Sequence, residues 1–178
     1  FYGEPLLMVL VATVTASVLA LVIGLLSLRR GGLYFAILTL AFGQMMYFLA
    51  LGSLGGITGG VDGFTGFAVE PLPGAPSLER EFAGILGTLL HDISYVLFAG
   101  FFVLTVAVAV RIVRSPYGAI FQAIAENEQR VRFLGLNVWR YKLTAFVLSG
   151  AFAGVAGGLH TIHAQYVAVG SLYWITSG

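Results

Sequence analysis

Long runs of apolar residues, separated by short polar clusters, dominate this chain. Four runs stand out, at residues 6–28, 33–54, 93–113 and 143–161. An α-helix rises about 1.5 Å per residue, so about 20 apolar residues cross the ~30 Å hydrocarbon core of a bilayer. The first two runs carry no Asp, Glu, Lys or Arg and are long enough to cross; the fourth is shorter and rich in glycine. The pattern predicts an all-α, polytopic transmembrane helix bundle with about four spans.

Composition supports the membrane interpretation. Of the 178 residues, 58% are hydrophobic and only 10% are charged, whereas an ordinary soluble domain carries about 25% charged residues. The absence of cysteine excludes disulfides and thiolate chemistry. The chain opens with Phe1, and its first apolar run is too long for the hydrophobic region of a signal peptide. We therefore interpret residues 1–178 as a single transmembrane domain that is a fragment of a longer protein.

Basic residues gather in two of the connections between apolar runs. Arg29 and Arg30 follow the first run, and the segment 114–142 holds most of the others. The connection 55–92 contains one arginine, Arg80, against several acidic residues. Because basic connections stay on the cytoplasmic side of an inner membrane, we expect the N-terminus and 55–92 outside and 114–142 in the cytoplasm.

The two long connections have different patterns. The external loop 55–92 begins with glycine-rich turns. The apolar pattern over 78–89 then predicts a helix that is capped by Ser77 and lies at the membrane surface. In the segment 114–142, Ser115 and Pro116 have the pattern of an N-cap followed by proline at the first helical position. Gly135 supplies a helix stop. Apolar residues recur between them at near-helical spacing, at Ile120, Phe121, Ile124, Val131 and Leu134.

The segment 114–142 is therefore expected to form one amphipathic helix or two short ones. A connection of about 30 residues is longer than helix packing requires. We expect it to meet a partner protein.

Several stretches resemble a known family in the right order along nearly the whole chain. The sequence Gly-Leu-Tyr-Phe-Ala-Ile-Leu-Thr-Leu-Ala-Phe-Gly-Gln at 32–44 is similar to a signature of the branched-chain amino acid permease family. The resemblance continues at 58–63, 115–118, 123–128, 134–137, 141–149 and 153–159. It implies a membrane subunit of an ATP-driven importer, with ATP-hydrolysing subunits, a second permease subunit and a periplasmic substrate-binding protein as partners.

The same resemblance implies roles for particular residues. The segment 117–137 corresponds to the region that docks on the ATPase, and its candidate residues are Tyr117, Gly118, Ala123, Ile124, Glu126, Glu128 and Gly135. An amphipathic helix can insert apolar side chains into a partner's groove. The external glycine-rich motif comprises Thr58, Gly59, Gly60, Asp62 and Gly63. It lacks the Gly-Lys-Ser/Thr ending of a phosphate-binding loop, so we interpret it as a turn-rich element at the outer mouth of the pathway.

Within the apolar runs, a few residues have two interpretations. Gly150, Gly154 and Gly158 recur every fourth residue, which favours close helix packing over a wall of the permeation path. Gln44, next to Gly43, is an amide halfway along an apolar run. It requires hydrogen-bond partners there, either on a neighbouring helix or in the pathway.

No constellation of residues indicates catalysis. Glu126 and Glu128 lie among basic residues and favour surface ion pairs. The histidines at 91, 160 and 163 lack a recognisable ligand spacing, so we expect polar groups at the membrane interface. We expect no enzyme activity, no cofactor or metal and no nucleic-acid partner.

The resemblance therefore implies translocation of leucine, isoleucine and valine across the inner membrane, driven by ATP hydrolysis on separate subunits. The alternatives are a urea or short-amide permease of the same family and a secondary transporter driven by an ion gradient. A secondary transporter usually carries an ionisable residue inside a span, and none is evident here.

Overall fold

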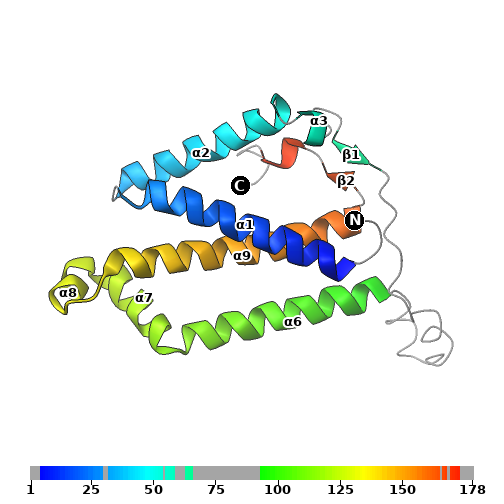
Figure 1. Cartoon of the computed structure of the whole chain (residues 1–178). Helices are drawn as coiled ribbons and strands as arrows, with labels where there is room; N and C mark the ends of the chain where they lie inside the picture. Colours follow the sequence, from blue (N-terminus) through cyan, green and yellow to red (C-terminus); the bar gives the residue numbers. More distant parts are fainter. Residues whose placement is uncertain are drawn as a thin grey trace, which may run out of the picture.

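A computed structural model describes residues 5–29, 32–53, 55–58, 63–65, 93–164, 166–167 and 169–172. Four long helices run along the molecule: α1 (Pro5–Ser27), α2 (Leu33–Leu51), α6 (Ile93–Val113) and α9 (Val138–Ala164). In Figure 1, α1 and α9 occupy the middle, with α2 on one side and α6 on the other. The prediction of an all-α polytopic bundle is confirmed.

Short elements close both ends of the bundle. At one end lie α7 (Pro116–Glu126) and α8 (Glu128–Phe133), both drawn at the left of Figure 1. At the other end, α3 (Gly55–Thr58) follows α2, and the 3₁₀ helix η3 (Val169–Leu172) packs against α2. Strands β1 (Phe64–Thr65) and β2 (Tyr166–Val167) pair there in antiparallel register, with Phe64 opposite Val167.

Three helices in the described part of the chain are long and apolar enough to cross a membrane by themselves, at Leu6–Ser27, Leu33–Leu51 and Val138–Ile162. A fourth span exists if α6 is counted together with α7, which follows it after a bend of 69°. Polar side chains inside α1 bond to their own helix: the Thr13 hydroxyl donates to the Val9 carbonyl at 2.7 Å. Such bonding lets a hydroxyl lie in hydrocarbon without a water partner.

Among the described helices, α1 and α9 share the most extensive contact. A Cβ atom added to Gly154 would lie 2.7 Å from Ala16 Cβ and 2.8 Å from Thr13 Cα. One added to Gly158 would lie 3.1 Å from Val9 Cα. These distances require the two backbones to approach each other closely, as small residues permit. We call this contact the α1–α9 seam; its residues are Val9, Ala12, Thr13, Ala16, Ala20 and Gly24 on α1, and Leu143, Phe146, Gly150, Gly154 and Gly158 on α9.

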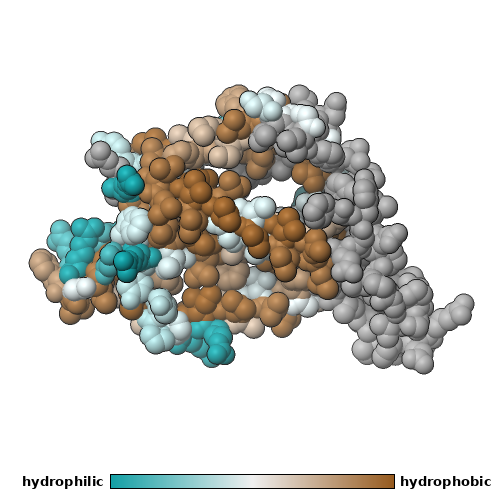
Figure 2. Space-filling model, viewed as in Figure 1, coloured by the Kyte–Doolittle hydropathy of each residue, from teal (hydrophilic) through white to brown (hydrophobic). Residues whose placement is uncertain are grey.

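The outward faces of the bundle remain apolar and exposed. Leu33, Tyr34 and Phe48 of α2 are more than half exposed, as are Phe102 and Val103 of α6. Figure 2 shows hydrophobic residues over the middle of this face, with hydrophilic residues gathered at the α7–α8 end. Lipid or further membrane helices must cover such a surface, because water cannot solvate it cheaply.

Helix boundaries differ from the predictions at several points. Helix α2 ends at Leu51 instead of residue 54, where Gly52 begins a turn. Helix α9 begins at Val138 instead of 143 and continues to Ala164 instead of 161. The prediction excluded Arg140 and Lys142 from the span, but a helix can continue past the hydrocarbon with its charged residues at the interface. The helix predicted over 78–89 lies outside the described residues.

Candidate functional site

The bend between α6 and α7 depends on the sequence Ser115-Pro116-Tyr117-Gly118. Ser115 is the N-cap of α7 and Pro116 lies in its first turn. The predicted cap differs in one respect, since the Ser115 hydroxyl does not bond within α7 but donates to the Ile112 carbonyl of α6 at 2.6 Å. A Cβ atom on Gly118 would overlap the Val113 carbonyl. Gly118 therefore permits the close approach of α7 to the end of α6 at this bend.

The segment after this bend forms two helices rather than one. Helix α7 ends at Glu126, and Asn127 has an extended backbone that interrupts the helical path. The Asn127 side chain then caps α8 by accepting a hydrogen bond from the Arg130 amide at 3.0 Å. Gly135 has a φ of +81°, a conformation that favours glycine, and directs the chain away from α8 towards α9.

Glu128, at the first position of α8, makes two ion pairs. Its Oε1 atom lies 2.5 Å from a guanidinium nitrogen of Arg132, one turn further along α8. Its Oε2 atom accepts a hydrogen bond from Lys142, which belongs to α9. The hydrogen bond from Lys142 is the main cause that lowers the pKa of Glu128, with Arg132 contributing further; partial burial opposes both. The carboxylate is therefore held in its ionised form.

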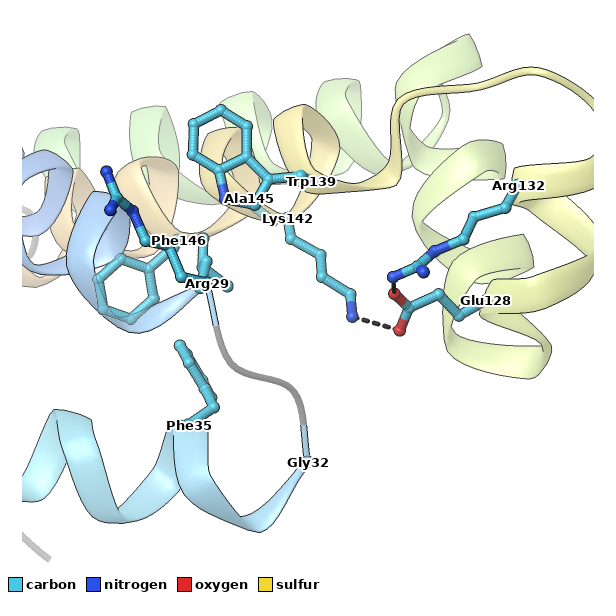
Figure 3. Close-up of a pocket in the computed structure, with 10 residues that line it drawn as sticks. Arg29, Gly32, Phe35, Glu128, Arg132, Trp139, Lys142, Ala145 and Phe146 are labelled. Atoms are coloured by element: carbon cyan, nitrogen blue, oxygen red, sulfur yellow. Dashed lines mark hydrogen bonds and ion pairs between the residues drawn. The ribbon is translucent and has the colours of Figure 1, made fainter.

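A cleft of about 470 Å³ lies where the ends of α1, α2, α8 and α9 meet. In Figure 3, Lys142 and Arg132 point towards the Glu128 carboxylate, while the Arg29 guanidinium extends away from it. Phe35 and Phe146 face each other edge to face, with ring centres 5.9 Å apart. The cleft is lined by Leu28, Arg29, Gly32, Phe35, Glu128, Arg132, Trp139, Lys142, Ala145 and Phe146.

The segment from α7 through α8 has both buried and exposed apolar residues. Val131 of α8 is 2% exposed and Val138, at the start of α9, is 3% exposed, so buried valines anchor the segment where it joins the bundle. Phe133 and Leu134, in contrast, are 90% and 74% exposed. Leu134 therefore does not share a buried face with Val131, as the near-helical spacing had indicated, because α8 ends at Phe133 and the chain turns there.

The remaining predicted segment residues lie on α7. Tyr117 is largely exposed and its ring lies 5.8 Å from that of Tyr141. Ala123 and Glu126 are exposed and Ile124 is half-buried. The structure thus brings Tyr117, Gly118, Ala123, Ile124, Glu126, Glu128 and Gly135 to one end of the bundle.

The predicted intramembrane residues separate into two groups. Gly150, Gly154 and Gly158 lie in the α1–α9 seam. Gly43 faces open space, with nothing within 4 Å of an added Cβ atom. The Gln44 amide nitrogen is enclosed and has no hydrogen-bond partner among the described residues. The same holds for the hydroxyl of Ser27, a fully buried residue near the end of α1 that the sequence did not single out.

The external glycine-rich motif is described only in part. Thr58 ends α3, and Gly63 has a φ of +66° immediately before β1. Gly59, Gly60 and Asp62 lie outside the described residues. Among the residues that the structure does describe, no group of three His, Cys, Asp or Glu could hold a metal ion.

Of the residues that connect α8 to α9, Glu128 was expected from the sequence to form a surface ion pair, but Lys142 and Val138 were not singled out. The spacing of Glu128 and Arg132 at i and i+4 is a recognisable pair signal. Lys142 lies 14 residues from Glu128, and only the reversal at Gly135 brings it near. Val138 was placed in a loop because the charges that follow it hid the start of α9.

Comparison with known families gives a match over residues 1–176 to the family described as the branched-chain amino acid transport system permease component. The chain belongs to this family. The order of long helices, with the α7–α8 segment between α6 and α9, is thus the arrangement of a branched-chain permease-family protein.

Two curated relatives support this assignment. The high-affinity branched-chain amino acid transport system permease protein LivM of Escherichia coli (strain K12) is 35% identical over 173 residues, which cover 88% of this chain and 40% of the relative. The protein of the same name from Salmonella typhimurium is 36% identical over 155 residues, covering 79% of this chain and 36% of the relative. The chain therefore spans well under half the length of these relatives.

No solved structure matches the chain. Family membership and the apolar helices together identify a multi-pass inner-membrane protein of the transport permease class.

Proposed function

We propose that this chain is part of a permease subunit of an ATP-driven importer that carries leucine, isoleucine and valine across the inner membrane. The observation that carries the proposal is the family match over residues 1–176. Both relatives described above are named as high-affinity branched-chain amino acid permeases. ATP hydrolysis belongs to separate subunits in this proposal, and the chain is a transport component without catalytic residues of its own.

The proposed orientation puts the α7–α8 end in the cytoplasm. Arg29, Arg114, Arg130 and Arg132 lie at this end and are exposed, and basic residues near membrane helices are retained on the cytoplasmic side. The N-terminus and the glycine-rich motif then lie outside, where a periplasmic substrate-binding protein delivers its ligand. The second permease subunit covers part of the exposed apolar surface of the bundle.

The α7–α8 segment is the proposed docking site for the ATPase. Phe133 and Leu134 are mostly exposed and Tyr117 is 56% exposed, all at the basic end of the bundle. Burying a large apolar side chain against a partner stabilises the contact by about 1.5–3 kcal/mol. These three residues are therefore the best candidates for insertion into a groove of an ATP-hydrolysing subunit.

Gln44 is the proposed polar contact along the substrate path. A zwitterionic amino acid needs hydrogen-bond partners in the membrane interior, and the enclosed Gln44 amide nitrogen has none of its own among the described residues. An amide binds substrate more weakly than a charged residue, so release is easy and specificity resides mainly in the external binding protein.

The test is uptake of labelled leucine by cells with and without the full-length gene, with urea as competitor and vanadate as ATPase inhibitor. The proposal expects gene-dependent uptake that vanadate blocks and excess urea leaves unchanged. Competition by urea would favour a urea or short-amide permease. Uptake that survives vanadate and collapses with the ion gradient would replace the proposal with a secondary transporter.

A further inference from the structure

Glu128 is the residue through which α8 is tied to α9. Its contact with Arg132 lies within α8 and stabilises that helix alone. Its contact with Lys142 joins two helices, and it is the one ion pair among the described residues that does so. Figure 3 shows the Lys142 side chain reaching from α9 to the carboxylate, with Arg132 on the opposite side.

Apolar contacts and partial burial support this ion pair. Val131, on α8, and Val138, at the start of α9, are almost fully buried, and the two helices are in contact. Glu128 and Lys142 side chains are each 34% exposed, so water only partly screens their attraction. A shift of α8 therefore pulls on the first turns of α9 through both apolar and charged contacts.

Helix α9 is in turn held to α1 along the α1–α9 seam. The seam begins at Leu143 and Phe146, which contact the site of Gly24, and continues through Gly150 and Gly154. Backbones packed at this distance cannot slide without collision. Helix α6, in contrast, reaches the segment through the 69° bend before α7. The stiff connection to the bundle thus runs through α9.

We infer that Glu128, acting through Lys142, is a positioning residue that makes α8, α9 and α1 move as one body when a partner displaces the α7–α8 segment. The inference rests on the proposed function, in which that partner is the ATPase. It assigns Glu128 an internal contact rather than a direct contact with the ATPase. If the contact between Glu128 and Lys142 is lost, ATP hydrolysis continues. A smaller part of the displacement of the α7–α8 segment then reaches the membrane helices.

The test uses the full-length permease in its complete complex, reconstituted in proteoliposomes with binding protein, so that leucine uptake and ATP hydrolysis are measured together. The variants are Glu128→Gln, Lys142→Gln, both changes together, and the exchange of Glu128→Lys with Lys142→Glu. Each single variant is expected to lower uptake per ATP hydrolysed by about three- to fivefold. The double variant is expected to lower uptake per ATP hydrolysed no further than either single variant does. The exchange of the two residues is expected to restore this ratio to within about twofold of the wild-type value.

Two controls accompany this cycle. Arg140→Gln removes a nearby exposed charge of α9 and leaves uptake per ATP unchanged. Glu126→Gln combined with Lys142→Gln gives additive effects, because Glu126 makes no ion pair with Lys142. A loss in Glu128→Gln that Lys142→Gln does not share, or a full loss in the exchanged pair, would overturn the inference and indicate direct contact between the carboxylate and the ATPase.

If uptake per ATP hydrolysed is unchanged in both single variants, the inference about Glu128 is overturned as well. A wild-type complex that takes up no leucine at all is a different result, since it refutes the proposed function before any variant is compared.

Discussion

The α1–α9 seam and the α7–α8 segment hold together by opposite means. The seam contains no charged residue. Its two backbones lie so close together that a Cβ atom on Gly150 or Gly154 would collide with α1. The segment relies on a side-chain cap at Asn127, on the ion pairs of Glu128 and on two buried valines. Close packing has few alternative arrangements. A helix cap contributes about 1 kcal/mol and a partly exposed ion pair about 1 kcal/mol or less, so each contact of the segment is weaker than the packing of the seam.

The difference separates a rigid part of the molecule from an adjustable one. The proposed transport function requires both, because a displacement at the α7–α8 end must be received by a segment that can move and passed on by helices that do not deform. Hydrocarbon strengthens this division. In lipid, contact between helices depends on van der Waals packing, while in water polar contacts can exchange with solvent.

The largest expected effect comes from breaking the seam with Gly154→Leu. A single Cβ atom at this position already lies 2.7 Å from Ala16 Cβ and 2.8 Å from Thr13 Cα, so the larger side chain forces α1 and α9 apart. We expect a destabilisation of about 3 kcal/mol and little monodisperse protein in size-exclusion chromatography of the full-length subunit. The matched control is Gly157→Leu, since nothing lies within 4 Å of a Cβ atom there. Equal recovery of the two variants would contradict a tightly packed seam.

A somewhat smaller effect is expected from Gly118→Ala, which adds a methyl group at the bend between α6 and α7. The added methyl group overlaps the Val113 carbonyl, so α7 must rotate away from α6 at a cost of about 2 kcal/mol. The seam is untouched, and the protein still folds in the membrane. Co-purification of the ATPase with tagged permease should fall, whereas Gly100→Ala, which meets nothing within 4 Å, should leave it unchanged. Normal co-purification with Gly118→Ala would show that the bend does not control docking.

Asn127→Ala is expected to have a milder and more local effect. It removes the acceptor for the Arg130 amide, which destabilises α8 by about 1 kcal/mol. Hydrogen exchange of the α8 amides should accelerate about fivefold, the ratio that corresponds to that energy. Asn127→Ser keeps a capping oxygen and should retain most of the protection. The α1–α9 amides should not respond to either change, and a global increase in exchange would argue that the two regions are one cooperative unit.

The rigid region was more predictable from sequence than the adjustable one, and the reason is physical. Membrane helices must satisfy their backbone within a single segment, so apolar runs alone indicate α1 and α2. The glycines at every fourth residue of α9 also indicated that another helix packs closely there. They did not indicate that this neighbour is α1. The tie between Glu128 and Lys142 depends on the chain reversal at Gly135 and on the early start of α9. The helix stop at Gly135 was predicted from the sequence, but the start of α9 at Val138 was not, because Arg140 and Lys142 interrupt the apolar pattern there.

The smallest expected effect is the pH dependence of the Glu128–Lys142 tie. The pKa of Glu128 is lowered, chiefly by Lys142, so the ionised carboxylate stabilises the folded segment at neutral pH. Because the folded pKa lies below the ordinary glutamate value, this contribution is fully present above the ordinary value and is lost as the pH falls through the lowered one. Exchange protection of α8 should therefore differ between wild type and Lys142→Gln near neutral pH and converge in acid. Glu126 gives the control, since Glu126→Gln removes a carboxylate outside the tie and should leave the pH dependence in place. A difference between wild type and Lys142→Gln that persists unchanged below the lowered pKa would mean that Lys142 supports α8 by packing of its aliphatic chain rather than by its charge.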